Sequence, residues 1–285
     1  MVVPRRYSYD LSVKSDVSDE LINVYVMRPA AGVLVRALYP TPITPNHVTL
    51  ASTAAGLGAA VLYFSGSPYS AAVAGICVTL KDLLDSADGQ LARAKQMHSR
   101  TGRFLDSLGD FLVNLSVFAA IGYALTSTSG NILYSVLALA GFLGLTLRVS
   151  YHVYYQTAFL HTQQLYATNR ITEEIKSEDL ETDRRALLLQ RIFQVLYGWQ
   201  DRLMVHIDGW CRQGTWNQDG GRDWFADRTG LRLSGVLGLG TELMLLTICS
   251  VTNHLTLYLY GNLVVMNGIW MASIWYRRKI LAFRV

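Results

Sequence analysis

The stretch "DSADGQLARAKQMHSRTGRFLDSLGD", residues 85–110, places acidic residues at the edges of two apolar segments. The preceding residues, "YSAAVAGICVTL", are almost all apolar, and the run then reaches Asp85, Asp88 and Arg93. The next apolar run begins with Asp106 and Asp110. Because ionised side chains are costly in an apolar environment and mark functional sites when they occur there, this stretch predicts a site within a bundle of apolar helices.

Apolar segments long enough to cross a membrane surround this stretch. About half of the 285 residues are apolar and only 16% are charged. A helix needs roughly 20 apolar residues to span a bilayer, and soluble bundles seldom bury helices this long that are apolar on every face. We therefore expect an all-α membrane protein with six transmembrane helices, at residues 47–65, 69–90, 103–126, 131–154, 233–252 and 255–276.

The charge of the connections predicts the orientation. The short connections "SGSPYS", "TSTSGN" and "VTNH" are uncharged, whereas "RAKQMHSRTGR" and the C-terminal "YRRK" are basic. Basic loops stay on the cytoplasmic side, and six spans put both termini on that side too. The N-terminus lacks the apolar core and cleavage site of a signal peptide. We expect a multi-pass membrane protein with both termini and the acidic site facing the cytoplasm.

Composition divides the chain into four parts. The N-terminal arm contains an amphipathic pattern, which predicts a helix at the membrane surface before the first span, with a break or kink at Pro29. The segment between the fourth and fifth spans is mixed in composition and predicts a partly helical cytoplasmic insertion, with a helix near 179–208. The parts are an N-terminal arm (1–46), the first four spans (47–155), the insertion (156–232) and the last two spans with the tail (233–285).

Several functional classes are disfavoured. The net charge of +4 is too small to indicate a nucleic-acid partner. Three cysteines far apart, Cys77, Cys211 and Cys249, indicate neither a disulfide framework nor a metal motif. A transporter also uses intramembrane acids, but its ions usually bind near the middle of the membrane at broken helices. Here the acids lie at the helix ends, so an enzyme is favoured and a transporter is the alternative.

Helical spacing gathers the acids on two facing stripes. Positions three or four apart share one face of a helix, and consecutive antiparallel spans bring their cytoplasmic ends to the same depth. Clustered carboxylates repel one another, and hard divalent ions such as Mg²⁺ or Mn²⁺ compensate them. Two such ions a few ångströms apart promote phosphoryl transfer. The stripes are Asp85, Asp88, Gly89 and Ala92 on one helix, and Gly102, Asp106 and Asp110 on the next.

The same stretch resembles the signature of the CDP-alcohol phosphotransferase (CDP-alcohol phosphatidyltransferase) family, D-x2-D-G-x2-A-R-x8-G-x3-D-x3-D. The six-span layout and the amphipathic arm are also similar to that family, although the insertion is longer than in its smallest members. Every specified position is present, as Asp85, Asp88, Gly89, Ala92, Arg93, Gly102, Asp106 and Asp110.

The resemblance implies a reaction and a role for each motif residue. Such enzymes move a substituted phosphate from a CDP-linked alcohol to a second alcohol and release CMP. It implies metal ligation by Asp85, Asp88 and Asp106, with Asp110 at the second of two ions and also acting as the general base. It implies a homodimer as well, and a nucleotide pocket formed by Gly89, Ala92, Arg93 and Gly102.

The "PNHVT" stretch adds residues at the membrane level of the motif. Similar stretches in the family line the cytidine pocket, which implies nucleotide contacts for Asn46 and Thr49. Helix capping by Asn46 is the alternative. Asp82 is expected either to contact the nucleotide or to orient Lys81 and its neighbours.

Two polar residues on the cytoplasmic half of the fourth span are candidates for a phosphate site. Arg148 and His152 lie four residues apart, and intramembrane charge is functional by default. A snorkelling arginine, or a pair between Arg148 and Glu242, is the alternative.

The substrates stay open. One possibility is CDP-diacylglycerol with a small polar acceptor such as glycerol phosphate, inositol phosphate or serine. The other is a CDP-linked headgroup (choline, ethanolamine or inositol) with a lipid or polyol acceptor. Both belong to lipid headgroup biosynthesis.

Overall fold

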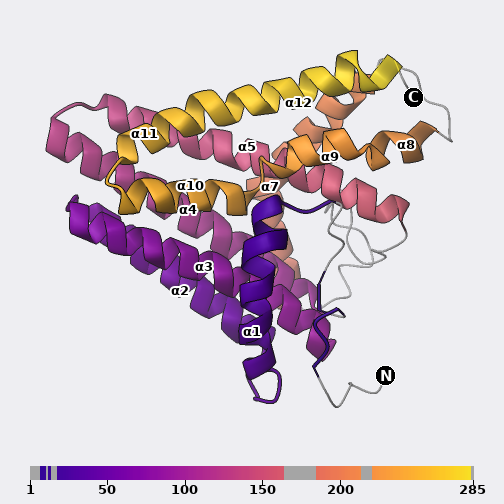
Figure 1. Ribbon diagram of the computed structural model, residues 1–285, viewed down its shortest axis with the longest axis horizontal. Helices are drawn as coiled ribbons and strands as arrows, with labels where there is room; N and C mark the ends of the chain where they lie inside the picture. Colours follow the sequence, from indigo (N-terminus) through magenta and orange to yellow (C-terminus); the bar gives the residue numbers. More distant parts are fainter. Residues whose placement is uncertain (1–6, 11, 14–17, 164–183, 213–219, 284–285) are drawn as a thin grey trace.

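The computed structural model describes residues 7–10, 12–13, 18–163, 184–212 and 220–283. Every regular element in these residues is helical, which confirms the predicted all-α class (Figure 1). The principal helices are α1 (Arg28–Leu38), α2 (Pro45–Phe64), α3 (Pro68–Lys95), α4 (Arg100–Ser129), α5 (Leu133–Thr162), α7 (Arg184–Arg212), α8 (Gly220–Ala226), α9 (Arg228–Gly235), α10 (Leu239–Val251), α11 (Leu255–Tyr260) and α12 (Asn267–Lys279).

Five helical segments are long and apolar enough to cross a membrane. They are α2, α4, α5, the pair α9–α10 (Arg228–Val251) and the pair α11–α12 (Leu255–Lys279). The remaining predicted span, 69–90, corresponds to α3, which is 28 residues long but carries Lys81, Asp82 and Asp85 within its middle turns. Length and composition therefore support five of the six predicted spans, and α3 departs because it carries acids of the motif.

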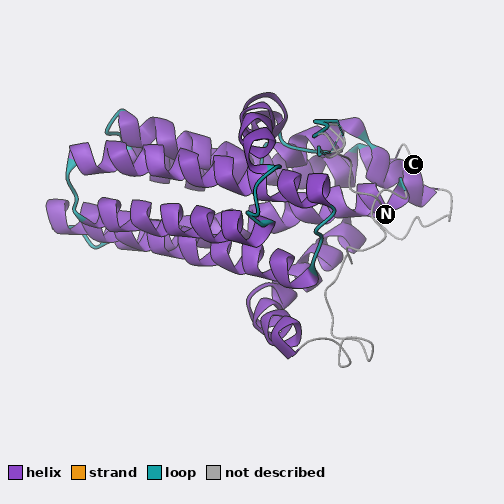
Figure 2. Ribbon diagram, turned by 90° about the horizontal axis from the view of Figure 1, so that it is seen from below, coloured by secondary structure: helices purple, strands orange, loops and turns teal. Residues whose placement is uncertain are grey.

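The long helices pack side by side, and α1 crosses them (Figures 1 and 2). The helix α3 lies between α2 and α10, while α4 packs against both α2 and α5. Their shared core is built from small and branched side chains, including Ala59, Val78, Ile121, Leu145 and Leu246. The short connections α2–α3, α4–α5 and α10–α11 gather at one end of this bundle (left in Figure 1). The motif therefore lies toward the opposite end.

Local caps fix the ends of the helices around the motif. Thr44 caps α2, because its hydroxyl accepts from the His47 N–H and the His47 side chain accepts from the Thr44 N–H. The prediction that Asn46 caps this helix is wrong, because Asn46 already lies in the first turn. At the other end of the motif, α3 stops at Gln96, which adopts a left-handed conformation (φ 55°). Ser99 then caps α4 through the Gly102 N–H, so a short connection joins α3 to α4, and both helices pack against α2.

Two other boundaries differ from the sequence expectations. A π-helical turn, Asn23–Met27, continues directly into α1, so Pro29 does not break the helix. The π-helical turn just before Pro29 changes the local hydrogen-bond spacing, as π-turns inside helices do. In the insertion, α7 extends to Arg212, beyond the predicted end. Residues 164–183 and 213–219 of the insertion lie outside the described residues.

A buried polar network joins α5 to the C-terminal helices. Arg148 is fully buried, and its Nη2 lies 3.1 Å from Glu242 Oε2 on α10, which confirms the predicted pairing. Its Nη1 donates to Asn267 Oδ1 at 2.6 Å and to the Asn262 carbonyl at 3.2 Å. Asn262 belongs to a π-helical turn, Gly261–Met266, between α11 and α12. The network therefore fixes α5, α10 and α12 relative to one another.

We predict that Glu242→Ala lowers the free energy of unfolding by about 3–5 kcal/mol, because it leaves the buried Arg148 charge without its partner. The control is the double variant Arg148→Met/Glu242→Met, which removes both charges and should stay much closer to the wild type. Thermal unfolding in detergent micelles measures both. Equal melting temperatures for Glu242→Ala and the wild type would contradict the prediction.

Candidate active site

Three carboxylates of the motif converge at the α3–α4 hairpin. Asp85 and Asp88 come from α3 and Asp106 from α4, and each offers one oxygen so that all three oxygens lie within 4.8 Å of one another. Asp88 is buried, and Asp106 Oδ1 is a buried oxygen with no hydrogen-bond partner among the described residues. Three close carboxylates, one with an unsatisfied oxygen, suit a hard divalent cation. The residues present therefore fit Mg²⁺ or Mn²⁺.

The fourth carboxylate of the motif is joined to the other three through a lysine. The ammonium of Lys81 pairs with Asp110 and lies 3.4 Å from Asp85 Oδ1. Lys81 itself is only 2% exposed, whereas the Asp110 side chain is 21% exposed. The expected gathering of four carboxylates is present, with a protein cation inside it. The sequence offered one signal for Lys81, its position four residues before Asp85.

The start of α2 completes this side of the site. The Thr49 hydroxyl lies 2.5 Å from Asp88 Oδ2 and 3.2 Å from the Pro45 carbonyl. Asn46 lies against Gly102, where an added Cβ would come within 2.7 Å of Asn46 Oδ1. A side chain at position 102 would displace the Asn46 side chain from this contact between α2 and α4. The structure thus brings Asn46 and Thr49 to the motif.

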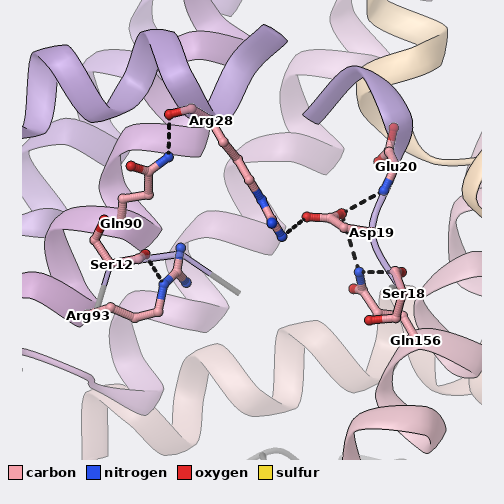
Figure 3. Close-up of polar contacts among 8 residues, drawn as sticks. All are labelled: Ser12, Ser18, Asp19, Glu20, Arg28, Gln90, Arg93 and Gln156. Atoms are coloured by element: carbon pink, nitrogen blue, oxygen red, sulfur yellow. Dashed lines mark hydrogen bonds and ion pairs between the residues drawn. The ribbon is translucent and has the colours of Figure 1, made fainter. Parts of the chain in front are cut away.

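The N-terminal arm binds the motif helix through backbone carbonyls (Figure 3). Arg93 Nε donates to the Ser12 carbonyl at 2.5 Å, and Gln90 Nε2 donates to the Arg28 carbonyl at 3.0 Å. The Arg28 guanidinium in turn pairs with Asp19. These contacts hold the arm beside α3. Two further motif residues, Gly89 and Ala92, are half-buried on α3, and the Arg93 guanidinium extends past Gly89.

Glu20 connects the same arm to α10. It is 5% exposed, and its Oε2 accepts from the Thr241 N–H at 2.9 Å. An added Cβ on Gly240 would lie 3.1 Å from Glu20 Oε2 and 3.6 Å from Asp82 Oδ2, so Asp82 also faces the start of α10. Burial raises the pKa of Glu20 to about 8, and the negative charges of Asp19 and Asp82 add to the rise.

The insertion covers the α4 side of the site. The Tyr197 hydroxyl on α7 donates to the Ser107 carbonyl at 3.0 Å, and its ring packs edge-on against Phe111. Burial, and then the charges of Asp110 and Asp106, raise the pKa of Tyr197 well above its usual range. Tyr197 is therefore a neutral donor next to two motif aspartates. The sequence analysis missed it, because an isolated tyrosine in an amphipathic helix carries no distinguishing signal.

The candidate phosphate residues lie in a different environment from the carboxylates. Arg148 and His152 are 0% and 3% exposed, and the hydrogen bonds of Arg148 go to Glu242, Asn262 and Asn267. An acceptor role for Arg148 and His152 stays a prediction. A hollow of about 560 Å³ between α4 and α5 lies farther along α4 and includes none of the motif aspartates.

These features define a helical membrane protein whose site holds clustered carboxylates at a helical hairpin. The CDP-alcohol phosphatidyltransferase family model matches residues 42–168, which include all of α2, α3, α4 and α5. The matched residues are similar to that family, and the motif that the sequence analysis identified lies within them.

Curated relatives share this region. The chain is 33% identical over 107 residues to the bifunctional IPC transferase and DIPP synthase of Thermococcus kodakarensis, covering 38% of this chain and 24% of the relative. It is 28% identical over 163 residues to the protein of the same name from Aquifex aeolicus, covering 57% and 35%. It is 32% identical over 116 residues to the phosphatidylinositol phosphate synthase of Cutibacterium acnes, covering 40% and 53%. These matches span from a quarter to about half of each relative's length.

We predict that Thr49→Val weakens Mn²⁺ binding by about 10–100-fold, because the hydroxyl that orients Asp88 is lost. The matched control is Thr53→Val, whose hydroxyl bonds only to the Thr49 carbonyl within α2. Titration of Mn²⁺ followed by electron paramagnetic resonance measures both. Equal affinities for the two variants would contradict a role of Thr49 at the carboxylates.

Glu20 should make stability depend on pH. A carboxyl whose pKa rises from 4.5 to about 8 on folding stabilises the folded state fully below pH 4.5 and loses this contribution as the pH rises through 8. The loss approaches about 1.4 kcal/mol per pH unit within this window. We predict that Glu20→Gln flattens the decline in melting temperature between pH 5 and 8. Parallel declines in Glu20→Gln and the wild type would show that Glu20 does not bind this proton.

Proposed function

We propose that this protein transfers a substituted phosphate from a CDP-linked alcohol to an acceptor alcohol and releases CMP, in phospholipid headgroup biosynthesis. The observation that carries the proposal is the convergence of Asp85, Asp88 and Asp106 within 4.8 Å, inside the segment that matches the CDP-alcohol phosphatidyltransferase family model. The protein is accordingly a divalent-metal-dependent transferase.

Asp85, Asp88 and Asp106 would hold the Mg²⁺ or Mn²⁺ ion. Such an ion, when bound, neutralises phosphate charge and stabilises the departing CMP. The family resemblance implies a second ion with Asp110 among its ligands. Asp110 pairs with Lys81 in the structure, so this second ion would have to take the place of the lysine ammonium.

Asp110 is the proposed general base. The acceptor hydroxyl oxygen attacks the phosphorus, a new phosphorus–oxygen bond forms, and the bond to the CMP oxygen breaks. Asp110 takes the hydroxyl proton as this happens. Its partial exposure leaves the carboxylate within reach of a bound acceptor. The neutral Tyr197 hydroxyl, by bonding to Ser107, keeps α7 over this side of the site.

The nucleotide pocket is proposed at the meeting point of α2, α3 and α4. The contacts of Asn46 with Gly102, and of Thr49 with Asp88, support it because they join these helices beside the carboxylates. The small residues leave room for the ligand near the backbone. The proposed contacts are Asn46, Thr49, Asp82, Gly89, Ala92, Arg93 and Gly102.

Two donor classes fit this site. The name of one relative, phosphatidylinositol phosphate synthase, favours CDP-diacylglycerol as donor and an inositol phosphate as acceptor. The alternative donor is a CDP-linked headgroup such as choline, ethanolamine or inositol, with a lipid or polyol as acceptor. The product's mass distinguishes the two classes, because only the first transfers the phosphatidyl group.

The membrane arrangement is also a proposal. In this arrangement α3 also crosses the membrane, which brings the number of spans to six, and its charged half reaches the cytoplasmic face. The helix α1 lies along that face, and both termini are on the same side. The three short, uncharged connections at the opposite end of the bundle support this orientation (Figure 1). The protein would work as a homodimer. Its four parts would be 1–46, 47–155, 156–232 and 233–285.

Release of CMP by the purified protein tests the proposed reaction. With Mg²⁺ or Mn²⁺ and a panel of donor and acceptor pairs, we expect CMP release from at least one pair. Asp110→Asn should lower the rate by about 10²–10⁴-fold, the usual contribution of a general base. The matched control is Asp223→Asn, an exposed carboxylate on α8, which should retain the wild-type rate.

The same preparations separate an enzyme from a transporter. Protein reconstituted in vesicles should release CMP without moving Mg²⁺ across the bilayer. Ion movement that depends on Asp85 and Asp88, with no CMP release from any donor, would show that the protein is a transporter and would refute the proposed enzyme.

A further inference from the structure

A lysine ammonium lies inside the carboxylate cluster. The Lys81 side chain is 2% exposed, and its Nζ pairs with Asp110 and lies 3.4 Å from Asp85 Oδ1. Lys81 therefore links the fourth motif carboxylate to the trio of Asp85, Asp88 and Asp106. This is the location in which a second divalent ion would have to bind.

The path of the Lys81 side chain is built by its neighbours. An added Cβ on Gly56 of α2 would lie 3.2 Å from Lys81 Cγ and 2.5 Å from Val113 of α4, so the lysine stem lies in the space that a glycine leaves. The Ser52 hydroxyl donates to the Lys81 carbonyl at 3.0 Å. Contacts on two helices thus hold Lys81 between α2 and α4, and the ammonium is directed at Asp110.

The buried ammonium disfavours a second divalent ion beside it. Such an ion would stand next to the Lys81 Nζ, which is already placed between Asp85 and Asp110. Like charges this close repel strongly where water is largely excluded. Asp110, already paired, also has less attraction to offer a second ion.

We propose that Lys81 takes the place of the second metal ion, so that the site binds one divalent ion on Asp85, Asp88 and Asp106 while the ammonium holds Asp110. This inference rests on the proposed function in treating the three aspartates as ligands. It makes Lys81 a positioning residue that fixes the base, and it departs from the two-ion expectation.

Counting bound Mn²⁺ tests the proposal without an activity measurement. Protein in detergent micelles is titrated with Mn²⁺, with and without CMP, and bound ions are counted by electron paramagnetic resonance. We expect one ion per chain and the spectrum of an isolated ion. Lys81→Met should bind two ions and give the spectrum of a coupled pair, because Asp110 becomes available. Lys81→Arg, which keeps the charge, should bind one.

The control variant is Lys279→Met, the same change at an exposed lysine at the end of α12, which should bind one ion. A coupled pair in the wild type would overturn the proposal, and this result needs no variant to fold. A single ion in a folded Lys81→Met would overturn it as well. CMP release is measured separately. If one ion is bound but no donor gives CMP release, the proposed reaction is contradicted, whereas the proposal of a single bound ion is still supported.

Discussion

Repulsion among carboxylates is the constraint around which the site is organised. Asp85, Asp88 and Asp106 bring oxygens within 4.8 Å of one another, toward one end of a largely apolar helical bundle. Such a cluster persists only where opposite charge and hydrogen-bond donors oppose the repulsion. The chain supplies the Lys81 ammonium beside Asp85 and Asp110 and the Thr49 hydroxyl beside Asp88. The remaining negative charge is what gives the site its affinity for a divalent ion.

The scaffold meets this constraint with rigid helices and one tight connection. Gln96 ends α3 in a left-handed conformation and Ser99 starts α4, so both acidic stripes stay at the same level. Elements distant in sequence then enclose the hairpin. The arm bonds to α3 through Arg93, α7 contacts α4 through Tyr197, and Glu20 binds the start of α10. Each uses a backbone group as one partner, so these contacts depend on where the helices lie.

Local patterns predicted the elements well and long-range partners poorly. The apolar periodicity, the hairpin and the shared face of Asp85 and Asp88 follow from spacing within a helix. The pairing of Lys81 with Asp110 depends on how α3 and α4 each pack against α2, which no local pattern specifies. Asn46 was predicted as a cap because its residue type favours that position, but Thr44, two residues earlier, caps α2 together with His47. The π-helical turn Asn23–Met27 before Pro29 was not predicted either, because no local residue pattern indicates it.

The order of the chain has a consequence for biogenesis. Every carboxylate of the motif, together with Lys81 and Thr49, lies between Pro45 and Ser129, on three consecutive helices. The ribosome completes these helices before it makes α5, so the ion-binding hairpin is available while the rest of the protein is still being synthesised. The N-terminal arm, with Ser12 and Glu20, is made before these helices, whereas Tyr197 on α7 and Thr241 on α10 are made after them. The residues that surround the carboxylates therefore come from both sides of the motif in the order of synthesis.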